Sequence, residues 1–404
     1  MRIVIAPDKF KGSLSAPEVA RHLEKGLTKQ WTASAASSAL EVLRIPVADG
    51  GEGTLDAADG SGFTRRSAVV SGPTGQPLTA EFAVRGREAV IEMAAASGLA
   101  VLPGTSGNAG RPDSATARTS SSLGTGELIR AALDAGCRQI ILGVGGSANT
   151  DGGAGLLQGL GARLLDADGN DLPPGGAALA RLANIDFSGF DSRLDDARFV
   201  LASDVDNPLL GQEGAPAIFG PQKGASAADV KDLDAALARF VGVLAGEIGP
   251  RAVKAAGAPG AGAAGGVGYA AIAVLAATRR PGIDVVLEFT RLADRLENAD
   301  LVITGEGSLD EQSLLGKTPV GVARAAAAAG VPVVAVCGRT TLTPQQQRES
   351  GFRQVYPLTS LEAKVEVCIA EAGPLLEELG KHIGRDLADL TPAAHATTKE
   401  PLNV

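Results

Sequence analysis

Five loops in the 404-residue chain combine glycine with charged or polar side chains, and each follows a segment that reads as a strand. Ligands bind at the carboxyl ends of strands in open parallel sheets, so loops of this kind commonly line binding sites. Their backbone N–H groups can cradle phosphate, their lysines can neutralise it, and their carboxylates can hold Mg²⁺. The combination predicts phosphoryl transfer. The five loops are residues 8–13, 49–54, 143–155, 203–207 and 305–310.

Two known nucleotide-binding motifs, the P-loop and the dinucleotide fingerprint, match the chain only in part. A P-loop needs a glycine five positions before Gly316, and Glu311 stands there instead. The dinucleotide fingerprint fits better at Gly143–Ala148, which follows a predicted strand. Its expected acidic partner, Asp166 or Asp168, lies in a turn rather than at the end of a second strand. An NAD-dependent dehydrogenase of a small hydroxy acid therefore stays open as the alternative function.

The elements that position these loops alternate between strands and helices. The apolar segment Ile3–Ala6 predicts a buried strand, and a capping box that begins at Ser15 predicts the helix after it. Near the other end, Asp300–Thr304 and Val331–Val336 predict two strands, joined by a helix that begins at Thr318. Such units predict parallel pairing of the strands.

The fold class is therefore α/β, with two α/β domains. The chain ends predict a Rossmann- or flavodoxin-like domain with a parallel sheet. The middle of the chain has many glycine- and proline-rich turns and alternating segments typical of a hairpin, which predict a second, mixed α/β domain inserted into the first. The expected boundaries are 1–67 with 291–385 for the first domain and 68–290 for the second, with a frayed tail at 391–404.

The composition excludes several classes of protein. With 37 basic and 46 acidic residues the formal net charge is −9, and no long basic segment occurs, which argues against a nucleic-acid partner. The three cysteines are widely spaced and form no CxxC pair, which fits a reducing cytoplasm. No segment resembles a signal peptide or is long enough to cross a membrane. We therefore expect a cytoplasmic monomer or homodimer with small-molecule substrates.

Long strings of the sequence resemble the bacterial type I glycerate kinases. The resemblance runs from the first residue to about residue 375 and so covers nearly the whole chain. One departure concerns Asn149 and Thr150, which stand in the reverse of the usual order, so which of them faces a ligand stays open. The strings that carry the resemblance are 6–15, 46–54, 143–147, 202–211, 219–225 and 300–313.

The resemblance implies ATP-dependent phosphorylation of D-glycerate, with Mg²⁺ as cofactor. It also implies two α/β domains with the active site in the cleft between them. The reactivity of glycerate alone favours its less hindered C3 hydroxyl, whereas bacterial members of this family commonly make 2-phosphoglycerate. We follow the family and expect 2-phosphoglycerate, with 3-phosphoglycerate as the less favoured product.

Phosphoryl transfer depends mainly on positioning and charge, with a carboxylate to accept the hydroxyl proton. Asp204 is the first candidate for this base and Asp310 the second, and Lys11 is the candidate cation for the glycerate carboxylate. Simpler roles, such as an Asx turn or a solvated loop lysine, stay open for these residues. The other candidates are Lys9, Asp49, Glu52, Ser147, Asn149, Asp151 and Asn207 for substrate, Gly145, Gly146, Lys223, Gly305 and Ser308 for phosphate, and Asp206 and Glu306 for metal.

Overall fold

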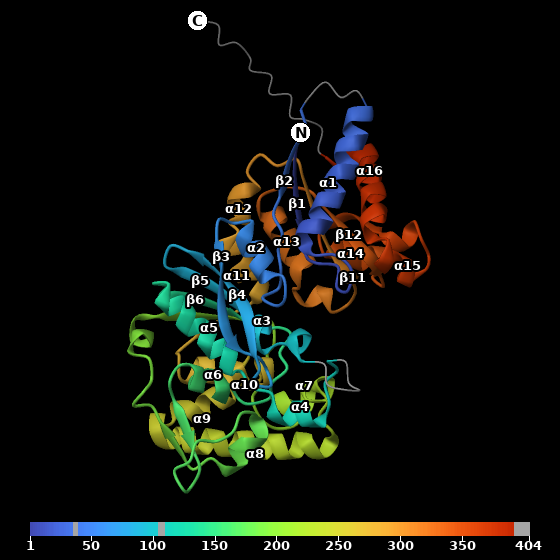
Figure 1. The fold of residues 1–404 in the computed structure, drawn as a ribbon. Helices are drawn as coiled ribbons and strands as arrows, with labels where there is room; N and C mark the ends of the chain where they lie inside the picture. Colours follow the sequence, from blue (N-terminus) through green and yellow to red (C-terminus); the bar gives the residue numbers. More distant parts are fainter. Residues whose placement is uncertain (35–38, 104–109, 392–404) are drawn as a thin grey trace, which may run out of the picture. The chain divides into compact units, whose positions relative to one another are not determined.

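The computed structural model describes residues 1–34, 39–103 and 110–391. Contacts between residues divide the chain into two compact units (Figure 1). Unit 1 comprises residues 1–48 together with 287–404, and unit 2 comprises residues 49–286. The first unit is thus built from both chain ends, and the second is an insertion, as the fold class predicted from the sequence requires.

The sheet of unit 1 has five strands, all parallel, in the order β13-β12-β11-β1-β2. Counted along unit 1, this is the order 2-1-3-4-5 of flavodoxin-like folds, whose ligands bind where the order reverses, between the first and third strands. Those strands are β1 and β11, which pair from Ile3↔Leu301 to Pro7↔Gly305. The five strands are β1 (Arg2–Pro7), β2 (Glu41–Arg44), β11 (Leu301–Leu309), β12 (Val333–Thr340) and β13 (Phe352–Pro357).

Helices cover the sheet of unit 1, and two of them pack closely on each other. The long helices α1 (Ala16–Ala33) and α16 (Ala372–Leu390) lie side by side in Figure 1. A Cβ at Gly26 would lie 2.0 Å from the carbonyl oxygen of Glu377, so only glycine permits this approach. Their apolar faces share a core with β1, β11 and β12. The other helices are α12 (Leu292–Arg295), α13 (Thr318–Ala328), α14 (Pro344–Glu349) and α15 (Val365–Ala370).

Unit 2 has a mixed six-stranded sheet in the order β10-β9-β6-β5-β4-β3. The first four of these strands are parallel, whereas β4 pairs antiparallel with both β5 and β3, which confirms the predicted hairpin. The strands are β3 (Thr64–Ser71), β4 (Pro77–Arg85), β5 (Glu88–Glu92), β6 (Gln139–Gly143), β9 (Arg198–Ala202) and β10 (Thr278–Arg280). A separate pair comprises β7 (Arg163–Leu165) and β8 (Asn184–Asp186).

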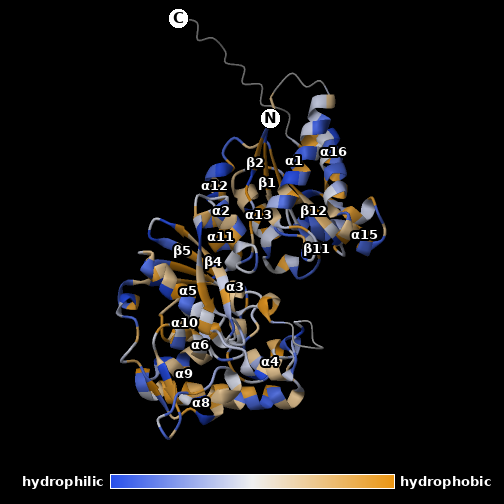
Figure 2. Ribbon diagram, in the orientation of Figure 1, coloured by the Kyte–Doolittle hydropathy of each residue, from blue (hydrophilic) through white to orange (hydrophobic). Residues whose placement is uncertain are grey.

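The helices of unit 2 are mostly short, and α8 is the long exception. Figure 2 shows hydrophobic colour along β4 and β5 and mixed colours along α8, as expected for buried strands and an amphipathic surface helix. The helices are α2 (Thr54–Asp59), α3 (Ala94–Ser97), α4 (Ser114–Thr119), α5 (Leu123–Asp134), α6 (Ala154–Gly159), α7 (Ala215–Phe219), α8 (Ala227–Ile248), α9 (Arg251–Ala256), α10 (Ala263–Ala273) and α11 (Gly282–Phe289), which crosses the boundary between the units.

The first boundary between the units differs from the predicted one. Contacts place it before Asp49, whereas the sequence pattern places it after residue 67. Helix α2 explains the difference, because it packs on β3, β4 and β5 of unit 2. In the described part of the chain, no helix is long and apolar enough to span a bilayer.

Candidate active site

Asp8 and Thr318 meet where the strand order of unit 1 reverses. Asp8 follows β1 and is only 8% exposed, and Thr318, the first residue of α13, is wholly buried. The Thr318 hydroxyl donates to Asp8 Oδ2 at 2.8 Å, and the Lys9 N–H donates to Oδ1 at 2.7 Å. A buried carboxylate needs such donors, so these bonds fix its orientation. Asp8 was not predicted as a site residue, although Lys9 beside it was.

Glu306 lies on the neighbouring strand β11, within the electrostatic reach of Asp8. The Ser313 hydroxyl donates a hydrogen bond to its carboxylate. Burial raises the pKa of Glu306 to about 7, the Ser313 hydrogen bond opposes the rise, and the charge of Asp8 adds to it. Two carboxylates in one partly buried place favour a bound cation, because a cation would offset their mutual repulsion.

Glu306, Ser308 and Asp310 were all predicted to lie in the loop 305–310. Instead β11 itself includes the first two, because it pairs with β12 as far as Ser308↔Arg339 and beyond. Both therefore point to the same face of the sheet. Asp310 follows the strand and accepts the Gln312 N–H at 2.9 Å, which makes it the first residue of an Asx turn.

The loop after β1 carries the two predicted lysines. The Lys11 side chain is exposed, and Lys9 is half-buried. A Cβ at Gly307 would lie 3.2 Å from the Lys11 backbone nitrogen, so this loop runs close along β11. The buried Gly305 accepts the Asp8 N–H through its carbonyl at 2.8 Å. Cationic and anionic groups thus meet at one edge of the unit 1 sheet.

In unit 2, main-chain segments crowd together at the carboxyl edge of the sheet. A Cβ at Gly145 would lie 2.6 Å from the Gly51 Cα, and one at Gly282 would lie 1.8 Å from the Asp49 carbonyl oxygen. Side chains are therefore excluded at these contacts. The loop after β6, the loop 49–54 and the start of α11 consequently touch each other through their backbones.

Asp204 follows β9 at this same edge, and its side chain is exposed. The Gly282 N–H donates to its Oδ1 at 2.8 Å. The surrounding protein nevertheless removes enough water to raise the pKa of Asp204 to about 6, while the Gly282 N–H opposes the rise and the charge of Asp49 adds to it. An accessible carboxylate that titrates near 6 is ionised at neutral pH and is suited to accept a proton.

Glu92 anchors the loop 49–54 and was missed by the sequence reasoning. It ends β5, is 8% exposed, and accepts the Leu55 N–H at 2.6 Å. Within the loop, Asp49 is half-buried and accepts the Gly51 N–H at 3.2 Å, whereas Glu52 is exposed. Nothing in the strand pattern around Glu92 distinguishes it from an ordinary strand residue.

Several residues predicted to bind ligands are buried instead, and three of them contact one another or the same loop. Asn149 is 0%, Asp151 1% and Lys223 1% exposed. Asp151 accepts hydrogen bonds at 2.8 Å from the Ser122 N–H, the Ser122 hydroxyl and Asn149 Nδ2. Lys223 Nζ donates to the Asn149 carbonyl oxygen at 2.5 Å. In this structure these side chains organise the loop after β6 and do not reach solvent.

The remaining candidates differ in how exposed they are and in whether another residue already binds their side chains. Asp206 is exposed and pairs with Arg279 at 2.7 Å, and Asn207 Nδ2 donates to a main-chain carbonyl, that of Glu213, at 2.9 Å. Gly146 is exposed with φ 73°, and Ser147 is only 6% exposed. Of these, Gly146 offers an open backbone to a ligand.

A resident metal centre is not built into the described parts of the chain. Among residues 1–34, 39–103 and 110–391, no group of three or more His, Cys, Asp or Glu side chains is placed to hold a metal ion. Mg²⁺ that arrives with a nucleotide needs only one or two carboxylates, because phosphates and waters supply its other ligands. Asp8 and Glu306 fit that requirement, whereas Asp206 is already paired with Arg279.

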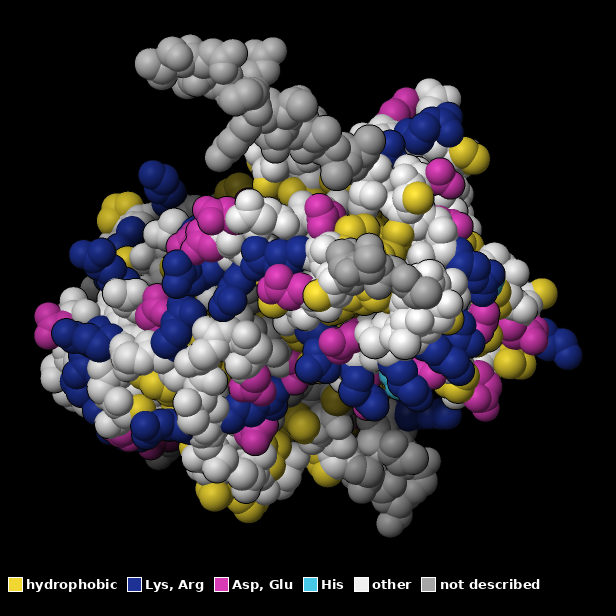
Figure 3. Space-filling model, turned by 90° about the horizontal axis from the view of Figure 1, so that it is seen from above, with side chains coloured by type: hydrophobic (Ala, Val, Ile, Leu, Met, Phe, Trp, Pro, Cys, Tyr) yellow, Lys and Arg dark blue, Asp and Glu magenta, His cyan; other side chains and the backbone are white. Residues whose placement is uncertain are grey.

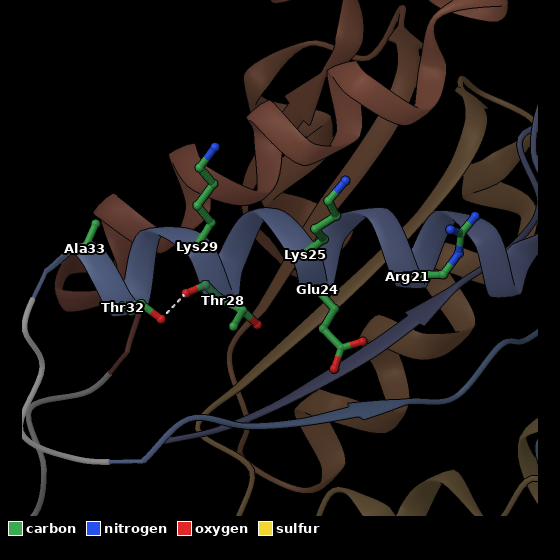
Figure 4. A pocket seen from close by; sticks show the side chains of 7 residues that line it. All are labelled: Arg21, Glu24, Lys25, Thr28, Lys29, Thr32 and Ala33. Carbon is green, nitrogen blue, oxygen red and sulfur yellow. Dashed lines mark hydrogen bonds between the residues drawn. The ribbon is translucent and has the colours of Figure 1, made fainter.

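A groove along α1 lies away from these loops. Helix α1 runs back from the carboxyl edge of β1, so its last turns lie toward the opposite edge of the sheet. In Figure 4, Lys25 and Lys29 point to one side of the helix and Glu24 to the other. Lys25 pairs with Glu377 at 2.8 Å, and Glu24 pairs with Arg44 at 3.2 Å. The lining residues are Arg21, Glu24, Lys25, Thr28, Lys29, Thr32 and Ala33.

Comparison with known proteins agrees with the family predicted from the sequence. The model of the glycerate kinase family matches residues 3–388. The glycerate kinase of Bacillus subtilis (strain 168) is 43% identical, over 96% of this chain and 98% of the relative. The glycerate 2-kinase of Escherichia coli (strain K12) is 45% identical, over 89% of this chain and 91% of the relative.

A solved structure agrees in fold as well as in sequence. The crystal structure of a protein provisionally named glycerate kinase 2, from Salmonella typhimurium LT2, superposes with a TM-score of 0.79. It is 41% identical in sequence, and the match covers 96% of this chain and 98% of that one. The match to the family model, the curated relatives and the shared fold together establish that the chain belongs to the glycerate kinase family.

Proposed function

We propose that this member of the family transfers the γ-phosphate of ATP to D-glycerate, with Mg²⁺, and forms 2-phosphoglycerate. The names of the relatives support the reaction class, and the name glycerate 2-kinase of the Escherichia coli relative supports the product. Transfer to C2 requires that the C2 oxygen, and not the C3 oxygen, be held in line with the γ-phosphate.

The observation that carries the chemical part of this proposal is the environment of Asp204. A glycerate hydroxyl is a weak nucleophile near neutral pH, so a carboxylate must accept its proton as the bond to phosphorus forms. Asp204 is exposed, oriented by the Gly282 N–H, and has a pKa of about 6 because of its surroundings. Asp310 also accepts a backbone N–H, but its side chain is half-buried, so we keep it as the second candidate.

Asp8 and Glu306 would hold the Mg²⁺ that accompanies ATP. Bound there, Mg²⁺ would neutralise charge that develops on the phosphates. Lys9 and Lys11 follow Asp8 in the chain and would interact with anionic oxygens, with the exposed Lys11 as the clamp for the glycerate carboxylate.

The glycine-rich edge of unit 2 would bind the substrate hydroxyls and phosphate oxygens. Asp49 and Glu52 are the proposed acceptors for hydroxyl protons, and the open backbone at Gly145 and Gly146 is the proposed donor set for oxyanions. The same edge argues against the dehydrogenase alternative, because the dinucleotide fingerprint must open directly into a helix. Helix α6 begins only at Ala154, well beyond the fingerprint.

The proposed partners are small molecules in a reducing cytoplasm. The three cysteines are free and buried, which suits that compartment. In Figure 3, Lys and Arg side chains are interspersed with Asp and Glu on the face that is visible, without the continuous basic stripe expected of a nucleic-acid-binding surface.

A coupled assay tests the function. The purified chain is supplied with ATP, D-glycerate and Mg²⁺, and release of ADP is followed. We expect release that depends on all three, and phosphorus NMR of the product is expected to identify 2-phosphoglycerate. Formation of NADH from NAD⁺ and glycerate without ADP release would replace the kinase by a dehydrogenase. A product identified as 3-phosphoglycerate would overturn only the regiochemistry.

A further inference from the structure

Lys223 is a buried charged residue that the proposed chemistry does not use. It ends the short 3₁₀ turn Pro221–Lys223 and is 1% exposed, so its ammonium group has no access to a phosphate in solvent. Burying an ammonium group is costly unless it is hydrogen-bonded and paired. A lysine at such a place must therefore interact with something specific inside unit 2.

Its hydrogen-bond partner lies in the loop between β6 and α6. Lys223 Nζ donates to the carbonyl oxygen of Asn149 at 2.5 Å, although the two residues are 74 positions apart in the chain. The same loop carries the buried Asp151, whose charge favours the ammonium form of Lys223. Lys223 thus contacts the loop main chain, while burial disfavours its ammonium form and the Asp151 charge opposes that effect.

The loop needs such an anchor because its own side chains leave polar atoms unsatisfied. Asn149 Oδ1 and Thr150 Oγ1 are buried and have no hydrogen-bond partner in the described part of the structure. Each buried polar atom without a partner costs free energy, so a further hydrogen bond from Lys223 to the main chain of this bend offsets part of that cost. On its other side the bend contacts a left-handed turn, where the Ala264 carbonyl accepts from Asn149 Nδ2 at 3.1 Å.

The anchored bend is continuous with the site edge of unit 2. Four residues before Asn149, Gly145 meets the backbone of Gly51 so closely that a Cβ would lie 2.6 Å from its Cα. Gly51 in turn donates its N–H to Asp49 at 3.2 Å, and the charge of Asp49 acts on Asp204. A shift of the Asn149 carbonyl would therefore move Gly145 and the loop of Gly51 and Asp49, and would change the charge environment of the proposed proton acceptor.

We infer that Lys223 is a positioning residue, which fixes the β6–α6 loop through the Asn149 carbonyl and thereby holds Gly145 against Gly51. The inference rests on the proposed function only for its effect on catalysis, since the anchoring itself is a property of the fold. On neighbouring elements, Arg118 of α4 pairs with Asp229 of α8 at 2.9 Å. Asp151 is thus the charge to which Lys223 responds.

The test compares Lys223→Met with the matched control Lys231→Met. Methionine keeps the length of the apolar stem but cannot donate, and Lys231 is an exposed lysine on α8. Hydrogen–deuterium exchange of peptides that cover residues 143–153 is measured without substrates. We expect faster exchange in Lys223→Met and wild-type exchange in Lys231→Met. Unchanged exchange in both variants would overturn the anchoring role.

Kinetics with ATP and D-glycerate then test the consequence. We expect kcat of Lys223→Met to fall about 10- to 100-fold, as displacement of a reacting group does, with the KM for ATP nearly unchanged. Lys223→Gln keeps an N–H donor and is expected to recover part of the loss, and it replaces the methionine variant if that does not fold. Faster exchange with unchanged kcat would overturn positioning. A wild-type chain without glycerate-dependent ADP release would instead refute the proposed function, while the exchange result would still decide the anchoring.

Discussion

The two units arrange their carboxylates in different ways. In unit 1, each of the two acids accepts a hydrogen bond from a side-chain hydroxyl, since Thr318 donates to Asp8 and Ser313 donates to Glu306. Asp8 accepts the Lys9 N–H as well. In unit 2, a main-chain N–H orients the acid Asp204, and its loops are packed glycine against backbone. The hydroxyl-held pair is partly buried and suited to a cation, whereas the backbone-held Asp204 is exposed and suited to proton transfer.

This difference means that similar residues acquire different chemistry from their surroundings. Burial is the largest cause of the raised pKa in both Glu306 and Asp204. The charge of a nearby acid adds to each rise, that of Asp8 for Glu306 and that of Asp49 for Asp204. The side chains differ in exposure, because Glu306 is half-buried and Asp204 is exposed. Substitutions that alter one arrangement and not the other separate the two roles.

The largest effect is expected from Asp204→Asn. The amide cannot accept the proton at neutral pH, so kcat should fall by about 10²-fold or more while the affinity for ATP stays close to that of the wild type. Steady-state kinetics measure kcat, and equilibrium binding of the nucleotide measures the affinity for ATP. Asp168→Asn is the control, because Asp168 is an exposed turn residue that only the dehydrogenase alternative uses. An unchanged kcat in Asp204→Asn would move the base to Asp310.

The pH dependence of the wild type sharpens the same assignment. The pKa of Asp204 is raised to about 6, and a base must be unprotonated to act, so kcat/KM for glycerate should fall as the pH drops below about 6. The expected slope is about tenfold per pH unit on that side. Measurements of kcat/KM between pH 5 and 8 record this decrease, and the residual activity of Asp204→Asn should not decrease in the same way below pH 6. A decrease that persists in the variant would assign it to another group.

Lys223 predicts a pH dependence of stability that is specific to unit 2. Burial lowers its pKa to about 7 from an unfolded value of 10.5, so between these values the unfolded chain binds a proton that the folded chain does not. Wild-type stability should therefore rise, relative to Lys223→Met, as the pH increases from 7 to 10.5, by on the order of a few kcal/mol. Below pH 7 the difference should be flat. Urea unfolding of both proteins at several pH values measures this difference in the free energy of unfolding. A difference that stays constant at every pH would contradict the lowered pKa of Lys223.

Gly145→Ala breaks the backbone contact on which the unit 2 arrangement depends. The new Cβ would lie 2.6 Å from the Gly51 Cα, so the two loops must separate at a cost of about 1–3 kcal/mol. Activity should fall with stability. Gly242→Ala is the matched control, since a Cβ there meets nothing within 4 Å on α8 and should be neutral or slightly stabilising. Thermal unfolding of the two variants compares them directly, and equal stability would mean that the loops are not held in contact.

Thr318→Val gives the smallest expected effect and tests unit 1. The substitution keeps the shape but removes the donor to the buried Asp8, at a cost of about 1–2 kcal/mol. The KM for ATP should also rise if Asp8 helps to hold Mg²⁺. Thr79→Val, on the exposed face of β4, should stay within about 0.5 kcal/mol of the wild type. Similar values for the two valine variants would show that the hydroxyl does not orient the carboxylate.

Local patterns in the sequence predict much of the framework. The apolar segment of β1, the capping box at Ser15 with Glu18, and the hairpin of β4 and β5 all follow from short-range rules, and the structure confirms them. The placement of Asp204 two residues beyond the end of β9 also follows from its position, because parallel strands present their carboxyl ends on one edge.

Long-range contacts are what the sequence could not supply. Asp8 and Thr318 are 310 positions apart, so their hydrogen bond has no local signal. Lys223 reads as a loop lysine between two glycines, and only the packing of unit 2 buries it. The segment around Gly305 and Gly307 reads as a loop because glycine disfavours strands, yet pairing with β12 extends β11 through it.

The pairing of β1 with β11 has a consequence for synthesis on the ribosome. Ile3 pairs with Leu301, so the first strand of unit 1 leaves the exit tunnel long before its central neighbour has been translated. At 5–20 residues per second, the wait for these roughly 300 residues lasts about 15–60 s. During that time the inserted unit 2 can complete its own sheet, while only β1 and β2 of the five strands of unit 1 have been made. The nascent chain must therefore keep the apolar strand β1 from aggregating until β11 has been translated.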